Sequence, residues 1–510
     1  MTDREVETEA AENRPLLDRA PSPARADGNG SLNGSGSGGH HWLRLVLIIS
    51  SIDLIINSTA QITLVPSTAI LQDIVCNKYY ASARLDPFIS FEDRCKVEPV
   101  QSEVAYINAW RDSFEMLVAV TLAIPYGALA DRVGRKFVFL LAVIGCLLSD
   151  VWIRAVYWFP EVFPLRMVWL SGIFQAIGGG GATLGSIGMV LIADACPPGK
   201  ITTAFSYVSA GLIASKLVGV PFGASFQNPW VPMWISSAVM VIGFFLAAAL
   251  IPESRQTPAG SSSPDESQSS DEEDDNLKLT LRNRLLNIIS AAGAVTRWVA
   301  SHPHIIPPML GFFFFQAGEA ANGTLLLQYA AKRLGLTLSE ASYLLSLSAA
   351  THLLVLTLFI PLLSSFLLRT LHLQDSVKDQ RLSQIFAVFL VLGTSLVALT
   401  SHVFLFTIGW VIASLGLAFT VPTRSVVTNM VEKEHLAVLY TGISVFLYGG
   451  LLVGGPAVAA LFKLGMRLGG VWLGLPFLVA TGCFVLCLGG VSVWRGETKG
   501  SEEEGLLGGE

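Results

Sequence analysis

The chain has 510 residues, of which 52% are hydrophobic and only 14% are charged, and its formal net charge is -6. Soluble globular proteins carry about 25% charged residues. This deficit and a mean hydropathy of +0.56 exclude a soluble enzyme and a disordered regulator. The acidic balance also excludes a typical nucleic-acid-binding protein, so the composition indicates a helical membrane protein.

The first 41 residues are polar and should form a flexible cytosolic tail. They contain no apolar core of a cleavable signal peptide, so the first spanning helix is expected to act as the insertion signal. The tail segment Glu12-Asn13-Arg14-Pro15-Leu16-Leu17 matches the acidic dileucine pattern E-x-x-x-L-L, which sorts cargo to vacuoles or lysosomes. We therefore expect the protein in the vacuolar membrane or the plasma membrane.

Twelve apolar segments follow, most of them long enough for a spanning helix of about 20 residues. Six precede a polar stretch at 252–303 and six follow it, which predicts an all-α membrane protein with twelve transmembrane helices in two six-helix bundles, 42–251 and 304–494. The segments are 42–66, 104–126, 137–158, 165–193, 202–226, 230–251, 304–329, 339–366, 384–401, 403–430, 436–463 and 470–494.

The stretch 252–303 carries the acidic run Asp271–Asp275 and reads as a disordered cytosolic linker. Within it, the basic and apolar residues of 277–299 form either an amphipathic helix on the membrane face or an ordinary connecting helix. Positive charges in short loops mark the cytosolic side, which places both termini, including the tail 495–510, in the cytosol. The residues assigned inside are Arg132, Arg135, Lys136, Lys200, Arg369, Lys378, Arg381 and Lys433; Lys332, Arg333, Lys463 and Arg467 fall outside.

Cys76 and Cys95 lie in the polar loop after the first segment, which this orientation places outside the cytosol. Disulfides persist in such oxidising compartments. Because the other four cysteines are assigned to helices or to the cytosolic side, we expect a Cys76–Cys95 disulfide, with two free thiols as the alternative.

Two polar stripes interrupt the apolar segments. Asp53, Asn57 and Gln61 recur every four residues in the first segment, and Gln316, Glu319 and Asn322 recur every three in the seventh. A charged group in the membrane is costly, so each stripe indicates either a water-filled path with a proton-binding carboxylate or interhelical hydrogen bonding. Glycine–proline clusters at 219–223 and 454–456 indicate an internal repeat, in which segment one corresponds to seven and segment five to eleven.

Other ionisable residues occur singly or in pairs. Lys216 is expected to pair with Asp53 or Glu319 or to extend toward an interface. Arg424 either binds an anionic group or anchors the cytosolic end of its helix, and His352 is either a titrating group or a hydrogen-bonded core residue. The remaining charged groups are interpreted as structural pairs, namely Arg111 with Asp112 and Glu115, and Asp150 with Arg154.

The loop between segments two and three reads Gly-Ala-Leu-Ala-Asp-Arg-Val-Gly-Arg-Lys over 127–136. This resembles the signature loop of the major facilitator superfamily, G-x-L-x-D-R-x-G-R-K. Glycine permits close helix approach and a tight turn, and an Asp131–Arg135 pair would form if the turn were helical. The resemblance implies alternating access, a cavity lined by helices one and seven, and a gating role for Gly127, Asp131, Arg132, Gly134, Arg135 and Lys136.

Weaker resemblances concern branches of this family. Residues 174–181 resemble a drug–proton antiporter pattern without its arginine, and we expect Gly178–Gly181 to lie mid-helix at a close helix contact. The fifth segment, with Gly211, Gly219, Pro221 and Gly223, partly resembles the antiporter motif. The long first loop with two cysteines resembles proton-coupled folate and haem-carrier-like transporters.

We therefore predict a secondary transporter that moves a small organic solute by alternating access, with possible proton coupling. The alternatives are a proton-driven drug exporter and a non-transporting receptor or nutrient sensor with the same fold. No phosphate-binding loop, zinc-ligand spacing or nucleophile elbow occurs. We expect no enzyme activity, cofactor, metal or nucleic-acid partner; the expected partners are a small solute, protons and lipid, and the expected state is a monomer.

Overall fold

The computed structural model describes residues 38–82, 95–196, 201–251, 305–370, 375–431 and 436–493. All regular secondary structure in these ranges is helical, which confirms the predicted all-α class. The dileucine pattern, the linker with its candidate amphipathic helix at 277–299, and the C-terminal tail lie outside the described residues.

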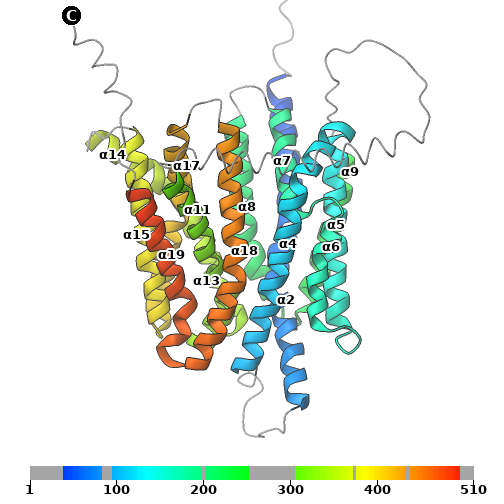
Figure 1. The fold of residues 1–510 in the computed structure, drawn as a ribbon. Coiled ribbons are helices and arrows are strands. Elements are labelled where there is room, and N and C mark those ends of the chain that lie inside the picture. Colours follow the sequence, from blue (N-terminus) through cyan, green and yellow to red (C-terminus); the bar gives the residue numbers. More distant parts are fainter. Residues whose placement is uncertain are drawn as a thin grey trace, which may run out of the picture.

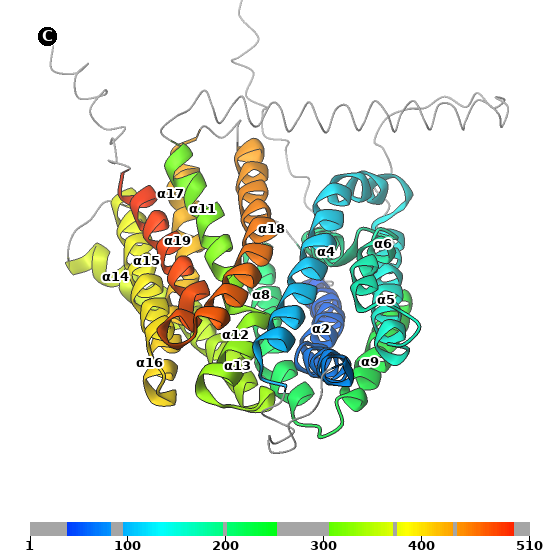
Figure 2. The ribbon, with the colours of Figure 1, turned by 60° about the horizontal axis from the view of Figure 1, so that its bottom comes forward.

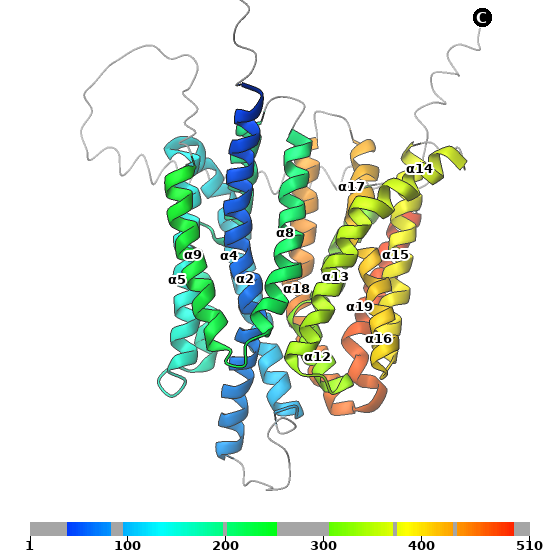
Figure 3. The ribbon, with the colours of Figure 1, turned by 180° about the vertical axis from the view of Figure 1, so that it is seen from behind.

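The N-terminal half begins with an unusually long helix, α2, whose 45 residues span about 67 Å at 1.5 Å per residue. This exceeds the hydrocarbon core of about 30 Å, so α2 projects beyond its neighbours (Figures 1 and 3). The helices of this half are α2 (Gly38–Ser82), α4 (Glu98–Val133), α5 (Arg135–Trp158), η1 (Leu165–Leu170), α6 (Ser171–Gln175), α7 (Gly180–Ala195), α8 (Ile201–Ala224) and α9 (Trp230–Leu250).

In the C-terminal half, several of the described helices change type along their length. Its elements are α11 (Ile306–Glu319), η2 (Ala320–Asn322), α12 (Thr324–Leu334), α13 (Leu338–Leu354), η3 (Val355–Phe359), α14 (Ile360–Thr370), α15 (Asp375–Leu399), α16 (Val403–Leu415), η4 (Gly416–Phe419), α17 (Thr420–Asn429), α18 (Leu436–Leu468), η6 (Gly470–Gly474) and α19 (Leu475–Ser492). Each predicted segment thus overlaps a helix. Within the described ranges, nine helices are long and apolar enough to cross a membrane.

Helix ends differ from several predicted boundaries. The first segment was expected to end at 66, but α2 continues to Ser82 and contains Cys76, which was expected in the loop. At the end of segment seven the difference concerns two basic residues. Lys332 and Arg333 were expected in a loop, but they form the last turn of α12. The helix ends one residue after Arg333, because Gly335 adopts a left-handed conformation with φ of 72° that glycine tolerates without steric cost.

The helices of the two halves lie on opposite sides of the molecule, and α4, α8 and α18 lie where the halves meet (Figures 1 and 2). Across this boundary α4 packs on α18 and α8 packs on α13. Within the halves α2 packs on α8, and α11 packs on α18. These pairings correspond to one another under the predicted repeat.

Glycines make the two intra-half contacts close. A Cβ atom at Gly223 of α8 would overlap the backbone carbonyl oxygen of Ile62 in α2, and one at Gly450 of α18 would overlap the carbonyl oxygen of Phe313 in α11. Small residues allow this backbone approach, which increases dispersion contacts where lipid provides no hydrophobic driving force between helices.

The glycine run at 178–181 does not lie mid-helix as expected. The helix ends at Gln175 and resumes at Gly180, because Gly178, Gly179 and Gly180 have φ values of 101°, 82° and 66°. Such positive values break an α-helix and favour glycine. The expected close contact is present, since a Cβ at Gly178 would lie 2.5 Å from the carbonyl oxygen of Leu141 in α5.

The end of α2 and the start of α4 lie at the end of the molecule opposite the start of α2 and the end of α19 (Figure 1). Cys76 and Cys95 are joined there by a disulfide. The two halves also meet at this end: Lys96 Nζ donates to the carbonyl oxygen of Gly335 at 3.4 Å, and Arg467 pairs with Glu98 at 3.2 Å. These contacts close the two halves together beside the first loop.

Candidate functional site

A cavity of about 140 Å³ lies between the two halves. Its walls come from α4 on one side and from α11, η2, α12 and α18 on the other. The lining residues are Ala105, Ala109, Asp112, Ser113, Glu319, Ala320, Gly323, Leu325, Gln328, Leu451, Gly455, Val458 and Ala459. The wall is therefore mostly small and apolar, with two carboxylates among the polar groups.

Glu319 occupies the point where the seventh predicted segment loses its α-helical form. It is the last residue of α11, a 3₁₀ turn follows, and Gly323 separates that turn from α12. Asn322 Nδ2 donates to Glu319 Oε2 at 2.7 Å. Asn322 Oδ1 is buried and has no hydrogen-bond partner among the described residues. The helix break thus presents a carboxylate and backbone polar groups at the cavity.

Lys216 on α8 lies within electrostatic range of Glu319 and of His352 on α13. Of the two carboxylates predicted as its counter-charge, Glu319 has Lys216 as an electrostatic neighbour, and Asp53 has Asn57 as its side-chain partner. No ion pair within 4 Å joins Lys216 to an acidic group in the described part of the chain. The result is a loose charge cluster to which both halves contribute.

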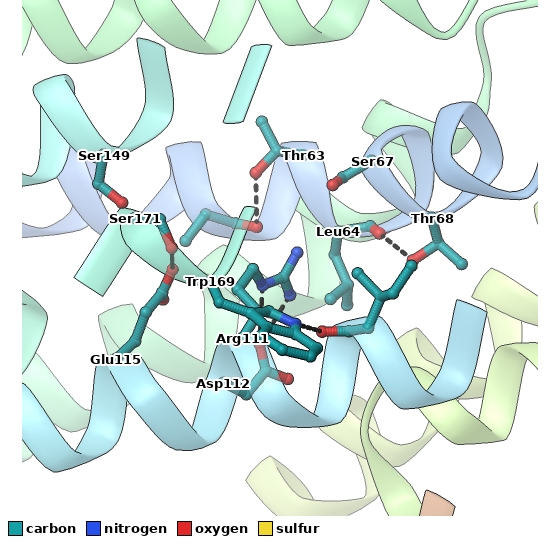
Figure 4. A network of polar contacts seen from close by, with 12 residues as sticks. Thr63, Leu64, Ser67, Thr68, Arg111, Asp112, Glu115, Ser149, Trp169 and Ser171 are labelled. Atoms are coloured by element: carbon teal, nitrogen blue, oxygen red, sulfur yellow. Dashed lines mark hydrogen bonds and ion pairs between the residues drawn. The ribbon is translucent and has the colours of Figure 1, made fainter. Parts of the chain in front are cut away.

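Asp112 is the second carboxylate of the cavity. Arg111 donates from Nε and Nη2 to Asp112 Oδ1 at 3.0 and 2.7 Å, and Figure 4 shows Arg111 reaching from α4 toward α2. The sequence indicated this pair but not its place at the cavity. Three small residues of α4, Ala105, Ala109 and Ser113, recur at helical spacing around Asp112. This stripe is the sequence signal that could have indicated that this face of α4 lines a cavity.

Glu115, one turn further along α4, has a structural role. It accepts a hydrogen bond from Ser171 at 2.7 Å, and Trp169 Nε1 donates to the carbonyl oxygen of Ile107 at 3.2 Å. Both contacts hold α4 against η1 and α6 (Figure 4). The predicted Asp150–Arg154 ion pair is also present.

The polar stripe of α2 does not share the cavity of Glu319. Asp53 is 5% exposed and accepts from Asn57 Nδ2 at 3.0 Å. A Cβ at Gly188 of α7 would lie 3.6 Å from Asp53 Oδ1, and one at Gly219 of α8 would lie 2.9 Å from Gln61 Cβ. Asp53 thus faces α7 and Gln61 faces α8, and no α2 residue is among the described residues that line the cavity of Glu319.

Two further candidates lie apart from the lining residues. Gln316 is half-buried on α11, and Arg424 is exposed on α17. Neither side chain lines the cavity. The described residues also contain no group of three or more His, Cys, Asp or Glu side chains that could hold a metal ion.

The loop at 127–136 is a sharp break between two helices. Gly134, with φ of 120°, separates α4 from α5, and its N–H bonds to the carbonyl oxygen of Ala130. Asp131 and Arg135 belong to different helices, so the continuous helical turn on which the expected pairing depended is absent; the side chains of Asp131 and Arg132 lie outside the described residues. Arg135 is buried and Lys136 is half-buried. Among the described residues, a Cβ at Gly127 would meet nothing within 4 Å, so none of them makes the close helix approach that was expected there.

Known proteins resemble the chain over most of its length. The efflux pump ustT of Aspergillus flavus is 39% identical over 464 residues, which cover 89% of each chain. The MFS efflux pump atnC of Emericella nidulans is 28% identical over 459 residues, covering 88% of this chain and 86% of the relative.

Solved structures show the same fold. A D-xylose–proton symporter matches with a TM-score of 0.58 at 14% identity, covering 90% of this chain and 99% of its own. The human organic anion transporter MFSD10 matches with a TM-score of 0.55 at 16% identity, covering 88% and 99%. The family model described as Major Facilitator Superfamily matches residues 107–365. With this match and the 39% identical relative, the chain belongs to the major facilitator superfamily of membrane transporters.

Proposed function

We propose that this protein is a secondary transporter that exports a small organic solute by alternating access. The observation that carries the proposal is the cavity between the two halves, which contains carboxylates from both of them. Two relatives are named efflux pumps, and this supports export over import. The proposal includes a monomer with both termini in the cytosol.

The contacts beside the first loop supply one gate. Lys96 and Glu98 on the N-terminal side bind Gly335 and Arg467 on the C-terminal side, so the cavity is separated from that face of the membrane. If these contacts break while the opposite ends of the two halves close, the cavity would open to one side of the membrane and then to the other. The loop formed by Gly127, Asp131, Arg132, Gly134, Arg135 and Lys136 lies at the opposite end and is proposed to control this rocking motion.

Proton coupling is assigned to Glu319, with Asp53 as a second proton-binding carboxylate. A charged carboxylate in apolar surroundings is energetically costly. Because binding a proton removes this charge, such a carboxylate favours proton exchange when no other cation compensates the charge. Lys216 and Asn322 act on Glu319 directly, and His352 lies within electrostatic range of Lys216, so these groups would adjust that exchange. Asp53 has only Asn57 as a recorded side-chain partner among the described residues.

Proteoliposomes test transport directly. A thermal-shift screen of a metabolite library identifies a bound solute, and counterflow of that solute is then measured with and without a pH gradient. Exchange across the vesicle membrane supports a transporter, whereas binding without counterflow favours the alternative of a receptor or nutrient sensor.

The coupling assignment has its own test. Glu319→Gln and Asp53→Asn should retain expression but lose stimulation of transport by a pH gradient. Glu103→Gln, which changes an exposed carboxylate outside the cavity, is the matched control. If both variants respond to the gradient as the control does, the proton sites are assigned incorrectly.

A further inference from the structure

We infer that the cavity binds a solute with a protonated amine and a nearby oxygen acceptor, held between Asp112 of one half and Glu319 of the other. The inference rests on the proposed transport function and specifies its substrate class. It follows from the charge of the lining, from polar atoms that lack partners, and from the shape of the apolar wall.

The two carboxylates of the lining have their nearest cations outside it, since Arg111 pairs with Asp112 and Lys216 lies within electrostatic range of Glu319. Asp112 and Glu319 line the cavity, and no Lys or Arg is among the described residues that line it. Arg111 occupies only Oδ1 of Asp112, and Asn322 occupies only Oε2 of Glu319. In the described part of the chain, Asp112 Oδ2 and Glu319 Oε1 have no hydrogen-bond donor, so each can accept one from an ammonium group.

The surroundings of Asp112 Oδ2 and Glu319 Oε1 also favour binding of a solute at these two atoms. The Asp112 side chain is 49% exposed, so an entering solute can reach it without displacing Arg111. Lys216 acts on Glu319 only through its field and makes no ion pair within 4 Å in the described ranges. Charge-assisted hydrogen bonds to carboxylates are roughly twice as strong as neutral ones, so an amine has the advantage over an alcohol or an amide.

Gln328 supplies an independent indication of a ligand. Gln328 is one of the residues that line the cavity, the residue is 1% exposed, and its buried Nε2 has no hydrogen-bond partner among the described residues. A buried donor left without a partner costs about 1–3 kcal/mol. A solute hydroxyl or carbonyl oxygen would satisfy it, which is why the inferred solute carries an acceptor as well as an amine.

The rest of the wall sets the size and polarity of the bound group. Leu325, Leu451 and Val458 are apolar, and Ala105, Ala109 and Gly455 are small. Sites for drug-sized ligands measure about 300–1,000 Å³, so a cavity of about 140 Å³ fits a compact amine or the amine-bearing end of a larger solute. The apolar wall favours a hydrocarbon or aromatic body beside that amine.

A matched series of small molecules tests the charge preference on the wild-type protein. The probes are 2-amino-1-phenylethanol, its diol counterpart 1-phenyl-1,2-ethanediol, and mandelic acid, each titrated against the purified full-length protein while thermal unfolding is followed. Only the amine should raise Tm. Equal or stronger stabilisation by the diol or the acid overturns the inference, and so does the absence of any shift with the amine.

Variants then place the bound amine. Glu319→Gln and Asp112→Asn should each weaken binding of the amine about tenfold or more, the fold-change expected from one charge-assisted hydrogen bond; Glu103→Gln is the control. Gln328→Leu should weaken 2-amino-1-phenylethanol but leave phenethylamine, which lacks the hydroxyl, unchanged. If Asp112→Asn does not fold, Asp112→Glu keeps the charge and should retain binding. Unchanged affinity in folded cavity variants contradicts the inference.

Counterflow of the same amine separates this inference from the proposed function. Amine binding at the cavity without exchange across proteoliposomes refutes transport and leaves the binding site standing. Exchange of an uncharged or anionic solute, with no effect of the amine, supports transport and refutes the inferred substrate class.

Discussion

Replacement of Gly223 by alanine should weaken the packing of α2 on α8. A Cβ atom at this position would overlap the Ile62 carbonyl oxygen and lie 2.8 Å from the carbonyl carbon. Favourable carbon–carbon contacts occur at about 3.5–4.0 Å, so the two helices must separate by roughly 0.7 Å or more at this point.

The loss of stability caused by the Gly223→Ala clash can be separated from the intrinsic preference of alanine for a helix. Overpacking a well-packed site typically costs about 1–3 kcal/mol, while alanine is favoured over glycine by about 1 kcal/mol in a helix interior. Gly211 lies on the same helix, and a Cβ there would contact only a side-chain carbon of Leu54, at 3.8 Å. Gly211→Ala therefore gains the helix-propensity term without the clash.

The assay is thermal unfolding of both variants in the same detergent, followed by tryptophan fluorescence, with transport measured in parallel. Gly223→Ala should unfold several degrees below Gly211→Ala, because 1 kcal/mol corresponds to roughly 2–4 °C in a unit of this size. The adjacent residues Gly450 and Gly449 of α18 offer a second pair, since only a Cβ at Gly450 would overlap backbone of α11. Equal unfolding temperatures for Gly223→Ala and Gly211→Ala would refute the packing argument.

Three further predictions concern other parts of the chain. Mass spectrometry of unreduced, alkylated protein should find Cys76 linked to Cys95, a bond over a separation of 19 residues that contributes roughly 3 kcal/mol in the chain-entropy model; two alkylated thiols would contradict it. Arg154→Met should cost about 3–5 kcal/mol in thermal or denaturant unfolding because it leaves Asp150 unpaired, and Asp150→Asn in the same chain should recover part of that loss. Alanine at 16–17 should shift the fluorescently tagged protein from vacuolar to plasma membrane, whereas an unchanged distribution would remove the sorting assignment.

The predicted sequence features that the structure bears out are those set by local chemistry. Apolar runs of membrane-spanning length give helices because a backbone in lipid must satisfy its hydrogen bonds internally. The loop at 127–136 identified the family because several residue types coincide there at fixed spacing. The Cys76–Cys95 disulfide followed from the exclusion of the remaining cysteines, although Cys76 lies in α2 and not in the polar loop where it was expected.

Tertiary packing decided which polar groups meet. A period of three or four places residues on one helical face, but it does not say which neighbour that face contacts. Thus the stripe of Asp53 faces α7 and α8, Glu319 meets the cavity, and Asp112 joins it from the other half. The break at Gly178 likewise depends on how closely α5 passes, a distance that only the packed helices determine.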